Sequence, residues 1–578
     1  MTTRSRAAGR ALASCCAVAV AATGLVAVAP PATSLPTADC AVAHPVSDLV
    51  GGAPVHGLTV SRGTTPQPFT GEVLGVLSNG IAPGLDMVVA ELSSPAIDAA
   101  GGIWQGMSGS PVYAEDGRLI GAVAYGLAWG SSPVAGITPF EDMDDFLGAA
   151  VAAPRVEVGP RMAARIAAET DVTRAQAGRG LEQLPMPVGV GGVGLARAEK
   201  AARARGSTLV DASSTRIGRS GGASAAGIDT VTAGGNVAAV LAHGDVTLAG
   251  VGSVTSVCGD RVVAFGHPMG FTGRTRLGLA AADAVYVQPD PLGVPFKVAN
   301  LGELGGTVTD DRLAGIAGTF GPVPAPTTFT SRVAYAGAAR TGTTEILHRS
   351  AAADVALFGV LGNHDRVVDG VVGGSQTQTW TITGTHGGES FRLRYADRYR
   401  SGSDIGWTGA FDLASVVATL SSSSRTRLDS VRSEITVRDD RRTFKVAKVR
   451  QRTGGKWVDV TGGTAKVRAG GTLKLRAVLS GSDGATRTVR RDVRVPKRLQ
   501  GERGVVSVVG GNVYQDDFWS VRSFDAVRTA LRKNLRNDEV ELTVSLGGGK
   551  DSLERVRRSD PLPRVVGGQK HVRVKVTR

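Results

Sequence analysis

Short apolar runs, separated by turns rich in glycine and proline, fill the first part of the chain. Between residues 49 and 150 these runs read GLTVSRG, FTGEVLGVL, LDMVVAEL, SPVYA and LIGAVAYG. Such runs are typical of strands in a small β-barrel or sandwich. The segment PFEDMDDFLGAAVAA at 139–153 has acidic residues in its first turn, which favours a closing helix. Residues 49–150 are therefore predicted to form one β unit.

The pattern changes at residues 151–224 and then returns to strands. The stretches MAARIAAE and LARAEKAARARG are rich in alanine, arginine and glutamate and predict helices, and a Gly/Ser-rich linker, SGGASAAG, follows them. Residues 225–335 again carry short apolar runs that end in turns. The sequence thus predicts a second β unit at 225–335, separated from the first by a helical insertion.

The remainder of the chain divides into three segments by the same criteria. Residues 336–420 mix a Val/Gly run with strand patterns such as QTWTITGTH. Residues 421–500 alternate polar and apolar positions in TFKVAKV, TLKLRAVL and TVRRDVRV, which predicts a β-sandwich. Residues 501–578 combine an amphipathic helix, FDAVRTALRKNL, with a strand, EVELTVSL, and are expected to form a C-terminal α/β segment.

The N-terminus has the features of a secretory signal peptide. Arginines at positions 4, 6 and 10 precede an Ala/Val/Leu-rich run at 11–29. Residues 1–29 are interpreted as the signal and the Pro/Ala/Thr-rich residues 30–48 as a linker. A signal retained as a membrane anchor is the alternative, and no later segment is long and apolar enough to span a membrane. The expected location is secreted or in the cell envelope.

Two of the four cysteines remain once the signal is set aside. Cys40 and Cys258 are candidates for one disulfide in an oxidising compartment, and two unpaired thiols are the alternative. The chain has no CxxC or HExxH spacing. No metal or other cofactor is therefore expected.

Charge is distributed unevenly along the chain. From residue 421 to the end there are 36 Lys/Arg and 17 Asp/Glu, a net charge of +19, while the whole chain carries +14. This excess points to an anionic partner such as a cell-wall polymer. The alternative is an ordinary solvated domain that uses arginine freely. Nucleic acid is a less favoured partner, because aromatic residues are sparse and no nucleic-acid motif is present.

The segment 101–126, GGIWQGMSGSPVYAEDGRLIGAVAYG, carries the strongest chemical signal. Ser108 lies among small residues and is followed by an apolar strand, a turn and a second strand. Glycines on both sides of a serine let backbone N–H groups converge beside the hydroxyl, which is how serine peptidases build an oxyanion hole. A β-hairpin with a Gly/Ser-rich entry turn is the alternative.

A catalytic serine needs a base, and His267 is the leading candidate among eight histidines. It follows an apolar strand and a turn in GDRVVAFGHPMG, where the flanking glycine and proline would hold the ring at a strand end. His243 ranks second. For the third member Asp86, directly before the strand in GLDMVVAEL, resembles the triad aspartate of chymotrypsin-like enzymes, although it also suits a turn cap.

Two other aspartates, Asp260 and Asp245, lie in turns and are weaker candidates for that third position. A Ser–His pair without a carboxylate is the remaining possibility.

Four blocks together resemble the SpoIVB (stage IV sporulation protein B) peptidase family: GGIWQGMSGSPV with GRLIGAVAYG, GITPFEDM, GSVTSVCGDRVVAFGHPMG and TVTDDRLAGIAGTFG. The resemblance implies serine endopeptidases with a chymotrypsin-like double β-barrel. It maps the nucleophile to Ser108, the histidine to His267, and the oxyanion hole to the N–H groups of Gly106 and Ser108.

The chain departs from the sporulation enzyme at three points. The histidine block follows the serine block, so the two halves are in exchanged order; the stretch Leu-Ser-Ser-Pro at 92–95 lacks the expected acidic residue; and no PDZ module is evident. The predicted fold is mainly β: a double β-barrel with exchanged halves, a helical insertion, and a basic β-sandwich domain.

The predicted function is an exported serine endopeptidase that acts on protein or peptide substrates by acyl transfer. A non-catalytic envelope binding or scaffold protein that retains the peptidase fold, and a protein that cleaves itself once, are the alternatives.

Overall fold

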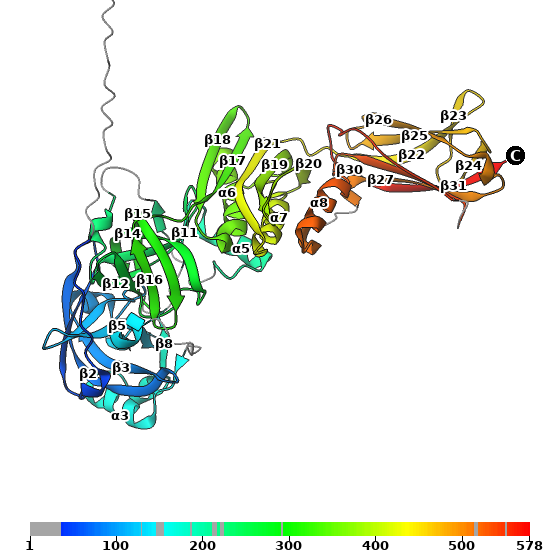
Figure 1. The fold of residues 1–578 in the computed structure, drawn as a ribbon. Helices are drawn as coiled ribbons and strands as arrows, with labels where there is room; N and C mark the ends of the chain where they lie inside the picture. Colours follow the sequence, from blue (N-terminus) through cyan, green and yellow to red (C-terminus); the bar gives the residue numbers. More distant parts are fainter. Residues whose placement is uncertain are drawn as a thin grey trace, which may run out of the picture. The chain divides into compact units, whose positions relative to one another are not determined.

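The computed structural model describes residues 36–128, 130–145, 155–184, 188–210, 217–219, 225–290, 293–513, 518–548 and 552–578 (Figure 1). The predicted signal peptide at 1–29 lies outside the described residues, as does the first part of the predicted linker and the end of the helix predicted at 139–153. The structure is mainly β, which confirms the predicted fold class.

The first β unit is a closed barrel. Its strands run in the order β4-β1-β2-β3-β6-β5, and a further β4–β5 pairing closes the ring. The strands are β1 (Pro54–Thr59), β2 (Gln67–Ala82), β3 (Leu85–Ser93), β4 (Pro111–Ala114), β5 (Leu119–Leu127) and β6 (Val134–Pro139). Helices α1 (Pro95–Ala100) and α2 (Phe140–Asp145) follow β3 and β6. β5 is buried along its whole length, since it borders the barrel core and also contacts the second barrel.

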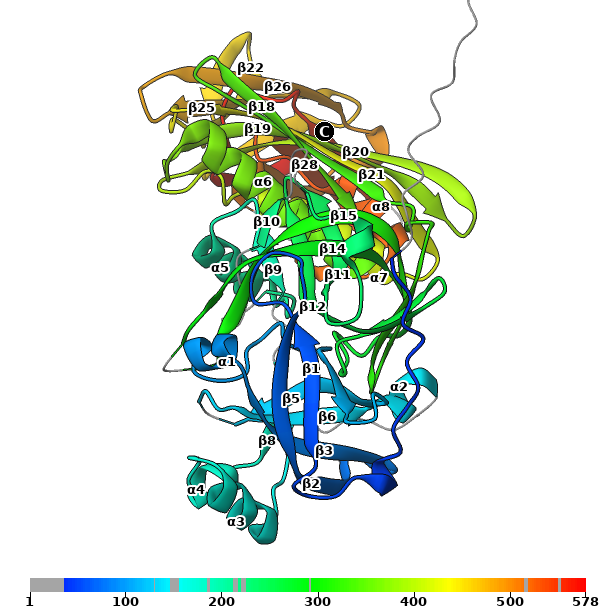
Figure 2. The same cartoon turned by 90° about the vertical axis from the view of Figure 1, so that its left-hand side faces the viewer.

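The second β unit closes in the same way. Its strand order is β11-β14-β15-β16-β13-β12, and β11 also pairs with β12. The strands are β11 (Asn236–Gly244), β12 (Thr247–Cys258), β13 (Arg261–Ala264), β14 (Gly273–Gln288), β15 (Phe296–Arg312) and β16 (Gly315–Phe320). Figure 2 shows strands of both barrels. Two closed barrels joined by direct hydrogen bonds, such as Ser253 N–H to Ser108 O at 2.7 Å, form the double barrel.

An N-terminal strap also connects the barrels. The Leu119 N–H of β5 donates to Val42 O at 2.8 Å, and the Asp39 N–H donates to Val257 O in β12 at 2.9 Å. Between these two contacts Cys40 forms a disulfide with Cys258. The residues predicted as a linker therefore include a segment that is fixed to both barrels.

The segment between the barrels is partly helical and partly an extension of their sheets. It contains α3 (Pro160–Glu169), α4 (Arg174–Ala177) and α5 (Leu195–Arg205), together with β7 (Arg155–Val156), β8 (Leu181–Gln183), β9 (Gly189–Gly191) and β10 (Ile217–Arg219). β8 pairs with β5 of the first barrel, and β9 pairs with β12 of the second. Apolar side chains such as Leu181 and Val190 are buried there, which explains why these short strands attach to the barrels.

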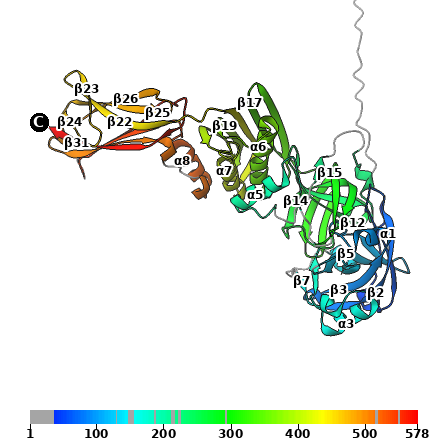
Figure 3. The ribbon, with the colours of Figure 1, turned by 180° about the vertical axis from the view of Figure 1, so that it is seen from behind.

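The middle of the chain forms a sheet covered by two helices. The strands are β17 (Thr327–Tyr335), β18 (Ala338–Ile346), β19 (Gly374–His386), β20 (Glu389–Ser401) and β21 (Thr426–Arg438), and the helices are α6 (Ala352–Val368) and α7 (Ala410–Ser422) (Figure 3). The Val/Gly run predicted as part of a mixed β segment lies mostly in α6. β21 pairs with β17 and β19, so it belongs to this sheet and not to the sandwich predicted at 421–500.

The C-terminal region is one sandwich of two sheets. One sheet consists of β22 (Phe444–Thr453), β23 (Lys456–Asp459), β25 (Thr472–Gly481) and β26 (Thr486–Arg494), with the short β30 (Val566–Gly567) beside β22. The other consists of β24 (Thr464–Arg468), β27 (Arg503–Gly510), β28 (Val540–Leu546), β29 (Leu553–Arg558) and β31 (Gln569–Thr577); α8 (Phe524–Lys533) lies between β27 and β28 in the chain.

A single apolar core joins the two sheets. The predicted division between 421–500 and 501–578 therefore runs through one domain, because the residues after 501 supply most of its second sheet.

Candidate active site

The loop that carries Ser108 is held in a tight, glycine-dependent conformation. Gly106 and Gly109 have φ angles of 92° and 96°, in the region that favours glycine. Inside the loop Met107 N–H donates to Trp104 O, and the Gly109 N–H donates to Val123 O at 2.8 Å. A Cβ on Gly109 would collide with Ser253 O and lie 2.5 Å from Phe265 N, so the second barrel approaches the loop too closely for any other residue.

Two backbone donors in this loop are left for a ligand. Among the hydrogen bonds of the described residues, the N–H groups of Met107, Gly109 and Ser110 are all donors, whereas those of Gly106 and Ser108 are not. These are the two groups that the sequence assigns to the oxyanion hole. Two free N–H groups beside a serine hydroxyl are suited to stabilise negative charge on a carbonyl oxygen.

His267 reaches Ser108 from the other barrel. After β13 the chain turns through Phe265 and Gly266, whose φ angles are 73° and 69°, and this double left-handed turn directs the imidazole back toward the first barrel. The ring Nε2 lies 2.9 Å from Ser108 Oγ, which is hydrogen-bond distance. The structure thus brings together two residues that are 159 positions apart in the chain.

The other ring nitrogen of His267 has two neutral partners. Nδ1 lies 2.8 Å from the carbonyl oxygen of Pro268 and 3.0 Å from the side-chain amide of Gln183, at the end of β8. A carbonyl accepts only, so this contact requires the proton on Nδ1 and leaves Nε2 to accept the serine proton. The amide nitrogen of Gln183 that faces Nδ1 also donates to Pro268 O at 3.3 Å, so Gln183 contacts both the ring and the carbonyl.

Gln183 could not be identified from the sequence, because nothing in the LEQLP stretch indicates that β8 ends beside the imidazole. Asp311 was not predicted to have a role, although it lies in one of the family blocks. The Asp311 carboxylate accepts from the N–H groups of Met269, Gly270 and Thr272 at 2.8 to 3.0 Å. It therefore fixes the loop that follows His267.

Burial keeps the imidazole neutral. His267 is fully buried, and desolvation lowers its pKa to about 4, against the smaller opposing effects of the Pro268 hydrogen bond and the negative charge of Asp311. Ser108 is fully buried as well. In this structure both side chains are therefore shielded from solvent, and the imidazole is unprotonated at neutral pH.

Asp86 does not contact this histidine. Its carboxylate accepts from Asn79 N–H at 2.7 Å, and Asn79 in turn accepts from Gly84 N–H at 2.6 Å. These bonds cap the hairpin between β2 and β3. The structure therefore gives Asp86 the role of a turn cap and removes the geometric basis for the proposed triad position.

Two of the weaker candidates, Asp245 and His243, are placed by the structure. Asp245 pairs with Arg340 at 2.6 Å, and His243 lies opposite Glu345 in the β11–β18 ladder. Within the described ranges the imidazole of His267 has no carboxylate hydrogen-bond partner.

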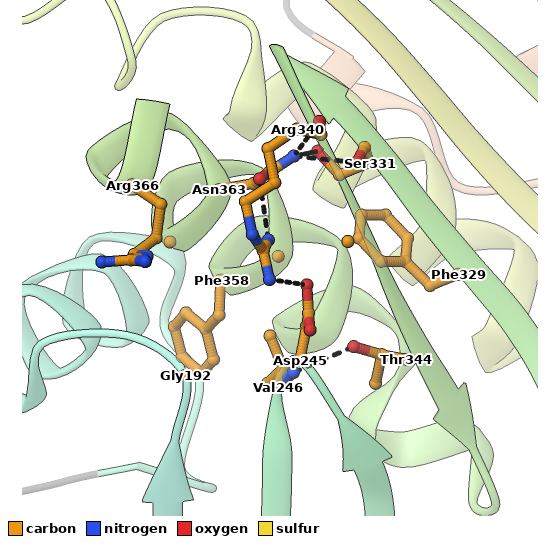
Figure 4. A pocket seen from close by; sticks show the side chains of 13 residues that line it. Gly192, Asp245, Val246, Phe329, Ser331, Arg340, Thr344, Phe358, Asn363 and Arg366 are labelled. Atoms are coloured by element: carbon orange, nitrogen blue, oxygen red, sulfur yellow. Dashed lines mark hydrogen bonds and ion pairs between the residues drawn. The ribbon is translucent and has the colours of Figure 1, made fainter. Parts of the chain in front are cut away.

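A separate cavity of about 180 Å³ lies between α6, β17, β18 and the turn before β12. Figure 4 shows Arg340 in this cavity between Asp245 and Asn363, with Phe329 and Phe358 nearby. Neither Ser108 nor His267 lines it. Its buried polar groups already satisfy one another, since Asn363 donates to Ser331 O at 2.8 Å and accepts from Arg340 at 2.9 Å.

No group of three or more His, Cys, Asp or Glu residues suited to hold a metal ion occurs in the described part of the chain. In the same residues, no helix combines the length and apolar character required to cross a bilayer.

Comparison with known proteins gave one match. The family model of the SpoIVB peptidase S55 matches residues 34–138, which include Ser108 and the oxyanion loop but not His267. No curated protein and no solved structure matched the chain. The match supports a serine peptidase. This match confirms, over residues 34–138, the resemblance to the SpoIVB peptidase family inferred from the sequence.

Proposed function

We propose that the protein is an exported serine endopeptidase that cleaves protein substrates by acyl transfer through Ser108 and His267. The observation that carries this proposal is the 2.9 Å contact between Ser108 Oγ and His267 Nε2. It joins a nucleophile loop and a strand-end histidine from different barrels. Because the pair lies beside two unused N–H donors, it supports a catalytic arrangement over a structural hydrogen bond.

The proposed reaction has two steps. In acylation, Ser108 Oγ attacks the scissile carbonyl while Nε2 of His267 takes the hydroxyl proton, and the N–H groups of Gly106 and Ser108 bind the oxyanion. The imidazolium then protonates the leaving amine. In deacylation, water attacks the ester with His267 again as base, which releases the acid and restores the serine hydroxyl.

The groups on Nδ1 determine how well this base works. The Pro268 carbonyl holds the productive tautomer, as the triad aspartate does elsewhere, and Gln183 contacts both that carbonyl and the ring, but neither group carries a charge to stabilise the imidazolium. The absence of a charged partner supports a slower base than a carboxylate-assisted one. Opening of the site would also rehydrate the ring and raise its pKa toward the ordinary value.

The test is peptide release from a denatured protein substrate. A mixture of denatured proteins is incubated with the purified wild type, Ser108→Ala or Asp86→Asn. New N-termini in the mixture are then detected by mass spectrometry. New termini are expected with wild type and Asp86→Asn and not with Ser108→Ala. Equal cleavage by Ser108→Ala would overturn the proposal.

Export has its own test. The proposal rests on the charged and apolar pattern of residues 1–29. It predicts that the protein recovered from outside the cytoplasm starts downstream of this run, which N-terminal sequencing detects. Recovery of the full-length chain in the cytoplasm alone would contradict it.

A second candidate function is a non-catalytic binding or scaffold protein with the peptidase fold. The neutral partners of His267 and the full burial of Ser108 favour it. This alternative predicts a well-folded protein with neither cleavage products nor reaction with a serine-directed probe.

A further inference from the structure

The outer face of one sandwich sheet carries a row of three arginines on neighbouring strands. Arg450 of β22 lies directly opposite Arg476 of β25, and Arg476 lies directly opposite Arg490 of β26. The residues before and after Arg476 in its strand, Leu475 and Ala477, are buried in the sandwich core. Because side chains alternate along a strand, the three arginines share the opposite, outward face.

One carboxylate borders the row: Asp459 of β23 lies directly opposite Arg450, but its ion-pair partner is Lys448, at 3.6 Å. In the described residues, none of its three guanidinium groups forms an ion pair, although many other arginines of the chain do. The Nε atoms of Arg450 and Arg476 are shielded from solvent and have no hydrogen-bond acceptor. The row therefore holds donors that are partly desolvated and unsatisfied.

Neighbouring side chains extend and stiffen the row. The guanidinium of Arg476 lies 3.9 Å from the ring centroid of Trp457 in β23, a cation–π contact that fixes it in place. Arg452 lies opposite Trp457, and Lys474 is the next outward residue on β25. Desolvation, together with the charges of Arg490, Arg450 and Arg452, lowers the pKa of Arg476, and the group nevertheless stays cationic at neutral pH.

The arrangement is unfavourable for the free protein. Like charges directly opposite one another in a sheet destabilise it. A bound anion would remove that repulsion. Because strands are spaced about 4.8 Å apart, three adjacent arginines present cations over roughly 10 Å, which suits an extended ligand with repeated charges.

The surroundings of the row disfavour two classes of polyanion, single-stranded nucleic acids and membranes. Trp457 is covered by Arg476, so its ring offers little area for the base stacking on which single-stranded nucleic acids depend. The other outward positions of β25 are Thr472, Lys474, Ser480 and the half-buried Val478, so this face lacks the large apolar side chains that enter a membrane. Guanidinium groups pair well with phosphate oxygens.

We propose that the Arg450–Arg476–Arg490 row binds a linear polymer of phosphodiester-linked polyols. The site lies in the sandwich, separate from Ser108 and His267, and it would hold the protein on an anionic surface while the barrels act on protein substrates. Its binding does not depend on peptidase activity.

The experiment measures binding of the full-length mature protein to poly(glycerol phosphate) by calorimetry at 150 mM NaCl. The row variant is R450Q/R476Q/R490Q. Its matched control is R503Q/R573Q/K575Q, which removes the same charge from exposed positions on the other sheet of the sandwich. We expect at least a tenfold loss of affinity in the row variant and less than a threefold loss in the control.

Three further measurements make the result decisive. The variant R450K/R476K/R490K keeps the charge and loses the bidentate fork, and it is expected to bind with intermediate affinity. The melting temperature of the glutamine row variant should equal or exceed that of wild type, since repulsion is removed. S108A should bind like wild type, which separates this proposal from the catalytic one.

The proposal would be overturned if wild type does not bind, or if the row variant and its charge-matched control lose affinity equally. It would also be overturned if wild type binds single-stranded DNA or phosphatidylglycerol vesicles more tightly under the same conditions.

Discussion

The contact between the barrels and the outer face of the sandwich differ in how they hold polar side chains. Two neutral polar side chains are buried at the first, and a row of arginines lies on the second. Ser108 and His267 are fully buried and depend on glycines that allow close backbone approach. Arg450, Arg476 and Arg490 depend only on strand register. The first region is sensitive to single-atom changes in packing, and the second responds to charge and salt.

The largest contrast is expected for an added methyl group. Gly109→Ala places a Cβ against Ser253 O at a positive φ, which should lower the free energy of unfolding by about 3–5 kcal/mol and abolish catalysis. In the sandwich, Gly462→Ala has a positive φ and open space, so it should cost about 1 kcal/mol. Denaturant unfolding measures the loss in free energy of unfolding for both variants. Equal losses would show that the two regions are packed equally tightly.

The disulfide gives the next largest effect, and it is confined to the barrels. Cys40 and Cys258 are separated by 218 residues, so their bridge restricts a long loop of the unfolded chain. The double variant Cys40→Ser/Cys258→Ser should lose about 2–5 kcal/mol of barrel stability. Calorimetry should show a lower melting temperature for the barrels and an unchanged melting temperature for the sandwich. A shift of the sandwich transition alone would contradict this assignment.

The buried histidine predicts a pH dependence of stability. The folded pKa of His267 is lowered to about 4, below its ordinary value of 6.5, so between these values the unfolded state binds the extra proton. Stability is then complete above pH 6.5 and falls as the pH approaches 4, by at most about 3 kcal/mol. His267→Gln should lose part of this dependence in denaturant unfolding at pH 4.5 and 7. An unchanged dependence would show that His267 is solvated.

The smallest effect is expected for Gln183. Gln183→Ala removes the amide that contacts both the imidazole and Pro268 O, while the Pro268 carbonyl itself remains, so serine reactivity should fall roughly five- to tenfold. Gln183→Glu introduces a carboxylate beside Nδ1 and should raise the pKa of His267. The acid limb of the reactivity–pH profile should then move to higher pH. A profile that does not move in Gln183→Glu would exclude a positioning role.

The sequence was most informative where function requires a local pattern. The glycines around Ser108 and the GHP turn at His267 are local features, so both residues could be predicted from the sequence. The assignment of β21 depends on a parallel pairing with β17 that no local pattern indicates. For the same reason Gln183 could not be identified and Asp86 was placed in the triad, since only the tertiary arrangement determines which polar side chain reaches the imidazole.

The most direct test of the central claim is labelling of the purified mature protein with a fluorophosphonate probe, with mass spectrometry to locate the adduct. The account predicts an adduct on Ser108 that is lost in Ser108→Ala, strongly reduced in His267→Ala and retained in Asp86→Asn. Folded wild-type protein that forms no adduct, or labelling that persists in His267→Ala at the wild-type rate, would contradict it.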